Sequence, residues 1–283
     1  MNICLFKQEE IDKPLKAADP RAQHIKKILH KGVGDTFAAG IIEGPAGTAT
    51  ITNADDDITF AFAPQSDGKP LFPLHMIIGF PRPIQLKRLL RDMAALGVAS
   101  VRLCGTELGE KSYLKAGLSD PREVYKMLLD GTVQAASTHV PKPYIYQSLA
   151  ECLDDLSLSG VTRQSFAQKI PAYVASLHFD IGGDSTALLA ERGQSSAGMT
   201  ALKLALDNVE PRSSLRAFLQ DNPPQGCPVF AAIGSERGWS PAERSLLESR
   251  GFVRLGMGSR IMRTETAATV SASVILDAMG ALE

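Results

Sequence analysis

Residues 229–240 read VFAAIGSERGWS and residues 252–267 read FVRLGMGSRIMRTETA, and these two stretches are the most informative about the fold. Each begins with an apolar run that predicts a buried strand, and each continues into a glycine loop. Between them, Ser240-Pro241-Ala242-Glu243 is a capping box with proline at the first helical position, which predicts the start of a helix. This order of elements is typical of an open α/β sheet, in which loops at the ends of neighbouring strands hold a ligand.

The two loops resemble the C-terminal signature of the bacterial 16S rRNA uridine-N3 methyltransferases, which belong to the SPOUT superfamily. That family has I-G-P-E-G-G-[FW]-[ST] and then a glutamate at the first loop, and L-G-x-R-I-L-R-x-E-T-A at the second. The matching residues here are Ile233, Gly234, Glu236, Trp239, Ser240 and Glu243, then Gly258, Arg260, Ile261, Arg263, Glu265, Thr266 and Ala267. The first loop departs from the signature, because Ser235 replaces a proline and Arg237 replaces a glycine.

The resemblance implies an α/β fold with a SPOUT-type parallel sheet and a C-terminal trefoil knot, preceded by a small PUA-like β-barrel. It also implies a homodimer whose sites are completed across the two-fold interface. The implied reaction is methyl transfer from S-adenosyl-L-methionine to a base nitrogen of ribosomal RNA. The favoured target is uridine N3 of 16S rRNA. The partner would be ribosomal RNA or the small ribosomal subunit.

The resemblance also implies which residues do this chemistry. Loss of the N3 proton leaves negative charge on the base, which Arg260 or Arg263 would stabilise through the carbonyl oxygens, and Glu236 joins them as a catalytic candidate. Glycines let a backbone approach a ligand closely. The expected cofactor cradle comprises Ile233, Gly234, Ser235, Glu236, Gly238, Met257, Gly258, Ser259, Ile261 and Met262.

Composition limits the alternatives without choosing among them. The 283 residues carry a net charge of −1, so RNA binding would have to use local basic patches. The four cysteines are scattered, which argues against a metal site and suits reduced thiols in the cytoplasm. The N-terminus does not resemble a signal peptide, and no apolar run reaches membrane length.

Residues 1–70 are expected to form the barrel domain. Arg21 to His30 predicts a helix, and residues 36–42, 48–52 and 58–62 predict strands of a meander or small barrel. His24 and the residues after it resemble the RNA-binding N-terminal domain of the family. The candidate RNA-binding residues are Arg21, His24, Lys26 and Lys27 here, with Arg82 and Arg88 beyond the linker. Either patch could instead be an ordinary solvated face.

Residues 71–283 are expected to form the methyltransferase domain. A strand at 74–80, a helix at 82–96 and a strand at 101–103 make a βαβ unit, which implies parallel strands. Further predictions are helical structure at 121–136, a strand at 173–179, a helix at 213–219 and an insertion around 150–200. The last helix offers an apolar stripe for a dimer partner or for its own sheet, made of Ala267, Val270, Val274 and Ala278.

Several departures from the family pattern leave two other functions open. The family lysine and glutamate near the end of helix 82–96 fall on Asp92 and Ala95, and two family arginines fall on Leu108 and Ser137. Such losses suggest a retained cofactor site with a changed RNA preference. The alternatives are a SPOUT methyltransferase with a different RNA target and a non-catalytic RNA-binding relative.

Overall fold

The computed structural model describes residues 2–115, 120–159, 201–224 and 226–282. The chain forms two compact units, one made of residues 1–71 and 129–140 and the other of residues 72–128 and 141–283. The predicted strand at 173–179 and most of the predicted insertion lie outside the described residues. None of the described helices combines the length and the apolar character needed to cross a membrane.

The first unit contains a four-stranded sheet. Its strands are β1 (Cys4–Phe6), β2 (Thr36–Ile41), β3 (Ala46–Asn53) and β4 (Thr59–Ser66), in the order β1-β2-β3-β4. β1 pairs parallel with β2, and the other pairs are antiparallel, so the three predicted strands are confirmed as a meander. The sheet buries Phe6, Phe37, Ile51 and Ile58 in one core.

The predicted helix of the first unit is shorter and more irregular than its apolar spacing suggests. The 3-10 turn η1 (Gln8–Glu10) precedes it, and α1 (Pro20–Gln23) passes directly into the π-helical stretch η2 (His24–Ile28). Ile25 is buried, but Ile28 and Leu29 are 65% and 39% exposed. A π-helix winds more widely than an α-helix, so residues at α-helical spacing no longer share one face.

Residues 129–140 belong to the first unit, although the sequence places them in the second predicted domain. The Thr138 hydroxyl donates to the Gly44 carbonyl at 2.7 Å, and the Val140 amide donates to the Glu43 carboxylate at 2.8 Å. A ring nitrogen of His139 lies 2.9 Å from the Asp67 carbonyl oxygen. These contacts join positions more than 70 residues apart, which no local pattern in the sequence predicts.

Within the described residues, the second unit is built on a seven-stranded sheet in which every pair is parallel. The strand order is β7-β6-β5-β10-β8-β11-β9. The strands are β5 (Phe72–Gly79), β6 (Val98–Cys104), β7 (Lys142–Tyr146), β8 (Leu202–Leu206), β9 (Ser213–Ser214), β10 (Val229–Ile233) and β11 (Val253–Gly256). The predicted α/β class and parallel sheet are confirmed.

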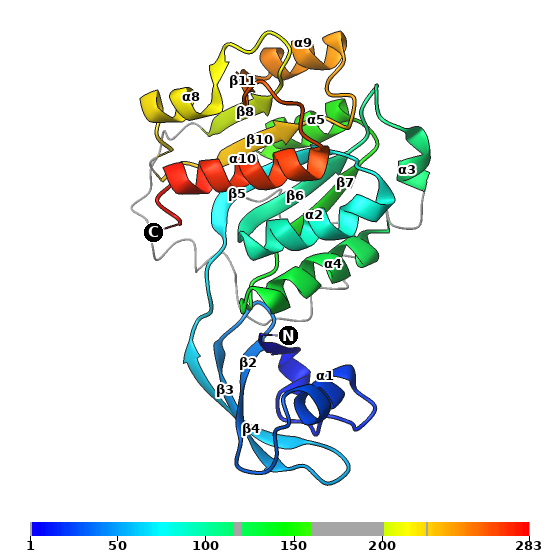
Figure 1. Cartoon of the computed structure of the whole chain (residues 1–283), viewed down its shortest axis with the longest axis vertical. Helices are drawn as coiled ribbons and strands as arrows, with labels where there is room; N and C mark the ends of the chain where they lie inside the picture. Colours follow the sequence, from blue (N-terminus) through cyan, green and yellow to red (C-terminus); the bar gives the residue numbers. More distant parts are fainter. Residues whose placement is uncertain (1, 116–119, 160–200, 225, 283) are drawn as a thin grey trace. The chain divides into compact units, whose positions relative to one another are not determined.

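Helices cover both faces of this sheet. Among the described residues, the helices that pack on its strands are α2 (Pro83–Ala95), α5 (Leu149–Ser159), α8 (Leu215–Asp221), α9 (Pro241–Ser249) and α10 (Thr264–Ala278). Two further helices are α3 (Lys111–Lys115) and α4 (Pro121–Gln134), and the last residues of α4 belong to the first unit. Figure 1 shows α2 and α10 side by side in front of the sheet, where they pack on each other. Leu149 of α5 and Leu247 of α9 share a buried cluster with Ile77 and Ala232 of the sheet. The helix predicted at 213–219 begins two residues later, because Ser214 caps it by accepting from the Ala217 amide.

The last helix buries a different face from the predicted stripe. The residues of α10 that are buried are Thr264, Ala268, Ser271, Ala272, Ile275 and Leu276. The four stripe residues are all at least partly accessible, and Val270 is 40% exposed. The stripe is therefore not the face with which α10 packs on its own sheet.

Candidate active site

The carboxyl ends of β5 and β10 mark the place where this sheet would hold a ligand. The two strands are neighbours, with Ile233 beside Ile78. From β5 the chain continues to β6 and β7 on one side, whereas β8 and β11 lie on the other side of β10. Ligands of open α/β sheets bind at such a reversal of strand order, outside the carboxyl ends of the strands.

The first glycine loop, residues 234–239, leaves β10 in a tight turn. The Gly238 amide donates to the Ser235 carbonyl at 2.8 Å, and Gly238 has a φ of 74°. A Cβ on Gly234 would come 2.7 Å from the carbonyl carbon of Gly238. Both glycines are therefore required by the turn itself. The capping box predicted after the loop is confirmed, since Ser240 and Glu243 bond each other's backbone amides at the start of α9.

Two predicted site residues meet at this loop. The Arg82 amide donates to the Glu236 carboxylate at 3.0 Å, and Nε of Arg82 lies 3.8 Å from the same oxygen. The Arg82 side chain is 66% exposed, so its guanidinium remains accessible. Arg82 follows β5 and Glu236 follows β10, so the pair lies at the reversal of strand order.

The second glycine loop, residues 257–263, leaves β11 and returns to the first. The Thr264 hydroxyl, at its end, donates to the Gly234 carbonyl at 3.4 Å. Gly258 has a φ of 103°, and a Cβ there would meet no atom within 4 Å. Arg260 and Arg263 are exposed, and their guanidinium groups form no hydrogen bond or ion pair with any residue that the structure describes. Both arginines are thus available to a ligand.

A third loop, which carries no motif in the sequence, lies between these two. β8 pairs with β10 on one side and β11 on the other, so residues 207–208 emerge between the glycine loops. The Met257 amide donates to the Asn208 side chain at 3.3 Å, and Asp207 accepts from Arg244 at 2.5 Å. In the sequence, Leu202, Leu204 and Leu206 alternate as in a strand, and Asp207 and Asn208 follow directly, so this pattern could have indicated the loop.

A cavity of about 480 Å³ lies on the other side of the first glycine loop. The residues after β6, the residues after β7 and the start of α9 line it. The Thr106 hydroxyl in its wall donates to the Ser235 hydroxyl at 2.9 Å. The predicted cradle residues are not among those that line this cavity, but its wall bonds the first glycine loop at Ser235.

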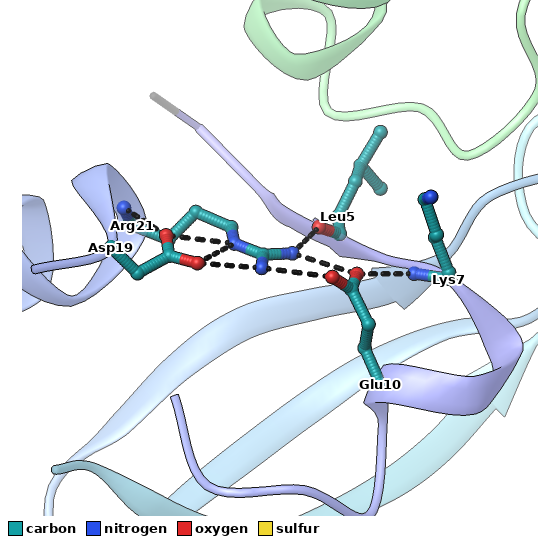
Figure 2. A network of polar contacts seen from close by, with 5 residues as sticks. All are labelled: Leu5, Lys7, Glu10, Asp19 and Arg21. Carbon is teal, nitrogen blue, oxygen red and sulfur yellow. Dashed lines mark hydrogen bonds and ion pairs between the residues drawn. The ribbon is translucent and has the colours of Figure 1, made fainter. Parts of the chain in front are cut away.

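In the first unit, Arg21 is held by its own neighbours. Figure 2 shows its guanidinium between the carboxylates of Asp19 and Glu10, with a further bond to the Leu5 carbonyl. Hydrogen bonds from Arg21 hold the pKa of Asp19 below its ordinary value. The side chain is only 24% exposed. This geometry gives Arg21 a structural role in the first unit.

The other RNA-binding candidates differ in accessibility. Lys27 and Arg88 are exposed. Lys26 donates to the backbone carbonyls of Asp55 and Asp56, which places its charge at the surface of the first unit. His24 is half-buried, and its Nε2 is a buried atom with no hydrogen-bond partner in the part of the chain that the structure describes.

Three of the departures from the family pattern make specific contacts. Ser235 is buried and bonds Thr106, Asp92 accepts from the Thr269 hydroxyl at 3.2 Å, and Ser137 accepts from the His139 amide at 3.3 Å. Ala95, Leu108 and Arg237 are exposed. The departures near the site are therefore accommodated by the fold.

Comparison with known proteins identifies the family of the chain. The family model of the RNA methyltransferase domain matches residues 67–177 and 163–276. Ribosomal RNA small subunit methyltransferase E of Treponema pallidum is 37% identical over 281 residues, covering 98% of this chain and 91% of the relative. Ribosomal RNA small subunit methyltransferase E 1 of Borreliella burgdorferi is 26% identical over 276 residues, covering 97% of each chain.

The fold is shared with a solved structure as well. Ribosomal RNA small subunit methyltransferase E from Neisseria gonorrhoeae, bound to S-adenosyl methionine, gives a TM-score of 0.67 at 17% identity over 99% of this chain and 98% of that one. At this identity the likeness concerns the fold. The family model and the Treponema relative span the loops that build the site, and they show that the chain belongs to the RNA methyltransferase family of ribosomal RNA small subunit methyltransferase E.

Proposed function

We propose that this chain is a cytoplasmic enzyme that transfers a methyl group from S-adenosyl-L-methionine to a base nitrogen of small-subunit ribosomal RNA. The favoured target is uridine N3 of 16S rRNA. One observation carries the proposal. In a member of the RNA methyltransferase family, the glycine loops after β10 and β11 lie on either side of the β8 end, at one edge of a parallel sheet. Ligands of open α/β sheets bind at this edge.

The loops suit a cofactor that is held through backbone groups. The space beside Gly258 is open, whereas the turn at Gly234 and Gly238 fixes the first loop tightly. We assign the cradle to residues 233–238 and 257–262, and add Asn208 because it bonds the second loop. When bound, the cofactor would supply an electrophilic methyl group on a positively charged sulfur.

The chemistry of the acceptor fits the exposed arginines. Uridine N3 becomes nucleophilic once its proton is lost, and the negative charge then spreads to the two carbonyl oxygens. Arg260 and Arg263 have no partner among the described residues and would donate to these oxygens. Fixed donors aimed at developing charge commonly contribute about 3–4 kcal/mol each to lowering the barrier. Glu236 would hold Arg82 beside them.

RNA recognition is proposed to be local, because the net charge of the chain is only −1. The candidates are Lys26, Lys27 and His24 in the first unit, and Arg82 and Arg88 at α2 in the second. Charge reversal at Lys26 and Lys27, or at Arg82 and Arg88, should weaken RNA binding and flatten its salt dependence. If neither pair alters RNA affinity, both patches are ordinary solvated faces.

We further propose the trefoil knot, the PUA-like barrel and the homodimer that accompany this site in the family. The accessible stripe on α10 supports the dimer, since Val270 is 40% exposed on a face that its own sheet does not cover. Val270→Glu should yield monomers in light scattering, and a wild-type chain that is monomeric at micromolar concentration would exclude the dimer.

The departures at Asp92, Ala95, Leu108, Ser137, Ser235 and Arg237 favour a changed RNA preference on a retained cofactor site. Two measurements separate the possibilities. Calorimetry with S-adenosyl-L-methionine distinguishes the enzyme from a non-catalytic RNA-binding relative. Mapping of methylated nucleotides in ribosomal RNA from a deletion strain then identifies the target, and a missing methyl group at a position other than uridine N3 would correct the proposed substrate.

A further inference from the structure

The cavity beside the first glycine loop has the size and the walls of a small-molecule site. Its volume of about 480 Å³ falls within the range of about 300–1,000 Å³ that is usual for ligand pockets. Phe80, Leu149 and Leu246 supply apolar walls. It opens at the carboxyl ends of β6 and β7, on the same edge of the sheet as the glycine loops.

The charges in the cavity select against a phosphate. Among the residues that the structure describes, three carboxylates line it, those of Glu107, Glu110 and Glu243, against one ammonium group, that of Lys111. A phosphodiester would be repelled by this net negative charge. A neutral, flat nucleobase meets apolar walls and hydrogen-bonding groups instead, as enzymes that modify bases require once the base has left its stack.

Glu107 is the carboxylate in this cavity that can still accept a hydrogen bond or a proton. Glu243 is buried and already accepts from the backbone amides of Ser240 and Glu107, both at 2.9 Å. Oε2 of Glu107 accepts from the Ser240 hydroxyl, which holds the side chain in place. Its Oε1 accepts no hydrogen bond from the residues that the structure describes. A positioned carboxylate oxygen in a cavity can accept a proton from a bound base.

We propose that this cavity receives the target base and that Glu107 accepts its N3 proton, an inference that rests on the proposed function. The N3–H bond breaks as the carboxylate takes the proton. The electron pair left on N3 then forms the new bond to the methyl carbon, and the carbon–sulfur bond breaks to leave a neutral thioether. The bond between Thr106 and Ser235 sets the cavity against the first glycine loop, on which the methyl donor is proposed to lie.

The first test removes the proton acceptor and keeps the shape. Glu107→Gln retains an oxygen for the Ser240 hydroxyl, so the protein should fold and bind S-adenosyl-L-methionine as the wild type does. We expect methyl transfer to small-subunit RNA to fall by about 10²- to 10⁴-fold. The remaining rate should rise about tenfold per pH unit, because hydroxide must then remove the N3 proton, whereas the wild-type rate, which uses the Glu107 carboxylate, should rise far less. Asp221→Asn, an exposed carboxylate at the end of α8 that does not line the cavity, is the control for loss of a carboxylate and should keep full activity.

The second test fills the cavity from an exposed helix position. Ala150 is exposed at the start of α5 and lines the cavity, so Ala150→Trp should block the base without disturbing the core. Ala242→Leu at the start of α9 repeats the block from another wall. Ala217→Trp, on the exposed side of α8, is the control for a bulky substitution. We expect both blocking variants to lose methyl transfer while the melting temperature and the affinity for S-adenosyl-L-methionine stay unchanged.

Each outcome decides between explanations. Full transfer by Ala150→Trp and Glu107→Gln would overturn the proposal and leave the proposed function intact. Loss of cofactor binding in Ala150→Trp would show that the cavity holds the cofactor, and would also overturn it. A wild-type chain that binds S-adenosyl-L-methionine but methylates no ribosomal RNA would refute the proposed function, and this inference with it.

Discussion

Gly79, the last residue of β5, packs so closely against the backbone of the first glycine loop that no side chain fits there. A Cβ at this position would lie 2.8 Å from the carbonyl carbon of Gly234 and would press against the Ser235 amide nitrogen. It would also come 2.9 Å from the Thr106 methyl group. Two of these neighbours are backbone atoms, so Gly79→Ala must displace either the loop or the strand.

The magnitude follows from the cost of overpacking, which is about 1–3 kcal/mol. If the loop moves and the core stays, this free energy appears as weaker cofactor binding, about 5- to 150-fold at 1.4 kcal/mol per tenfold. If the strand moves, the same free energy appears as lower stability, with a melting temperature reduced by about 2–4 °C per kcal/mol.

Calorimetry with S-adenosyl-L-methionine and thermal denaturation of the same preparation separate the two cases. We expect Gly79→Ala to lose affinity by at least about fivefold. Gly32→Ala, where a Cβ meets no atom within 4 Å, is the control and should match the wild type in both measurements. Wild-type affinity together with a wild-type melting temperature in Gly79→Ala would refute the reasoning that links β5 to the cradle.

Three further predictions concern other parts of the chain. Gly258→Val introduces a β-branched residue at a φ of 103° in open space, so binding of S-adenosyl-L-methionine should be abolished in a folded protein; unchanged calorimetric affinity would exclude the proposed cradle. Arg21→Ala leaves two carboxylates without their partner and should reduce the free energy of unfolding by about 2 kcal/mol in denaturant titrations, whereas the exposed Lys27→Ala should change it little; equal values for the two variants would show that the network adds no stability. Burial lowers the pKa of His75 to about 4, so the unfolded chain binds more protons than the folded one between pH 6.5 and 4. The free energy of unfolding should therefore fall by about 3 kcal/mol as the pH drops through that window. His75→Gln should remove this part of the pH dependence of stability, and an unchanged pH dependence in the variant would contradict the role given to His75.

The parts of the fold that follow from local patterns could be predicted from the sequence. The alternation of apolar runs, glycine loops and capped helices was enough to predict the parallel sheet, the strand of residues 229–233 and the start of α9. At that start, the side chains of Ser240 and Glu243 form a capping box. The two glycine loops were recognisable because each carries a long motif directly after a strand.

The rest depends on contacts that local patterns do not contain. Residues 129–140 join the first unit through bonds such as that from Thr138 to Gly44. The π-helical turn exposes Ile28, which α-helical spacing would bury. Asn208 enters the site only because β8 lies between β10 and β11 in the sheet, and that order is set by pairing across the whole second unit.

The most direct test of the proposed function is methyl transfer to RNA with the position mapped. The purified chain would be incubated with labelled S-adenosyl-L-methionine and with small-subunit RNA or ribosomal particles from a strain that lacks the usual enzyme. The products would be mapped by nuclease digestion and mass spectrometry. We expect label on one base nitrogen of the small-subunit RNA, foremost a uridine N3, and none with Gly258→Val. Full transfer at the usual uridine would show that the departures at Leu108 and Ser137 are neutral, whereas absence of label from RNA in every preparation would contradict the proposed function.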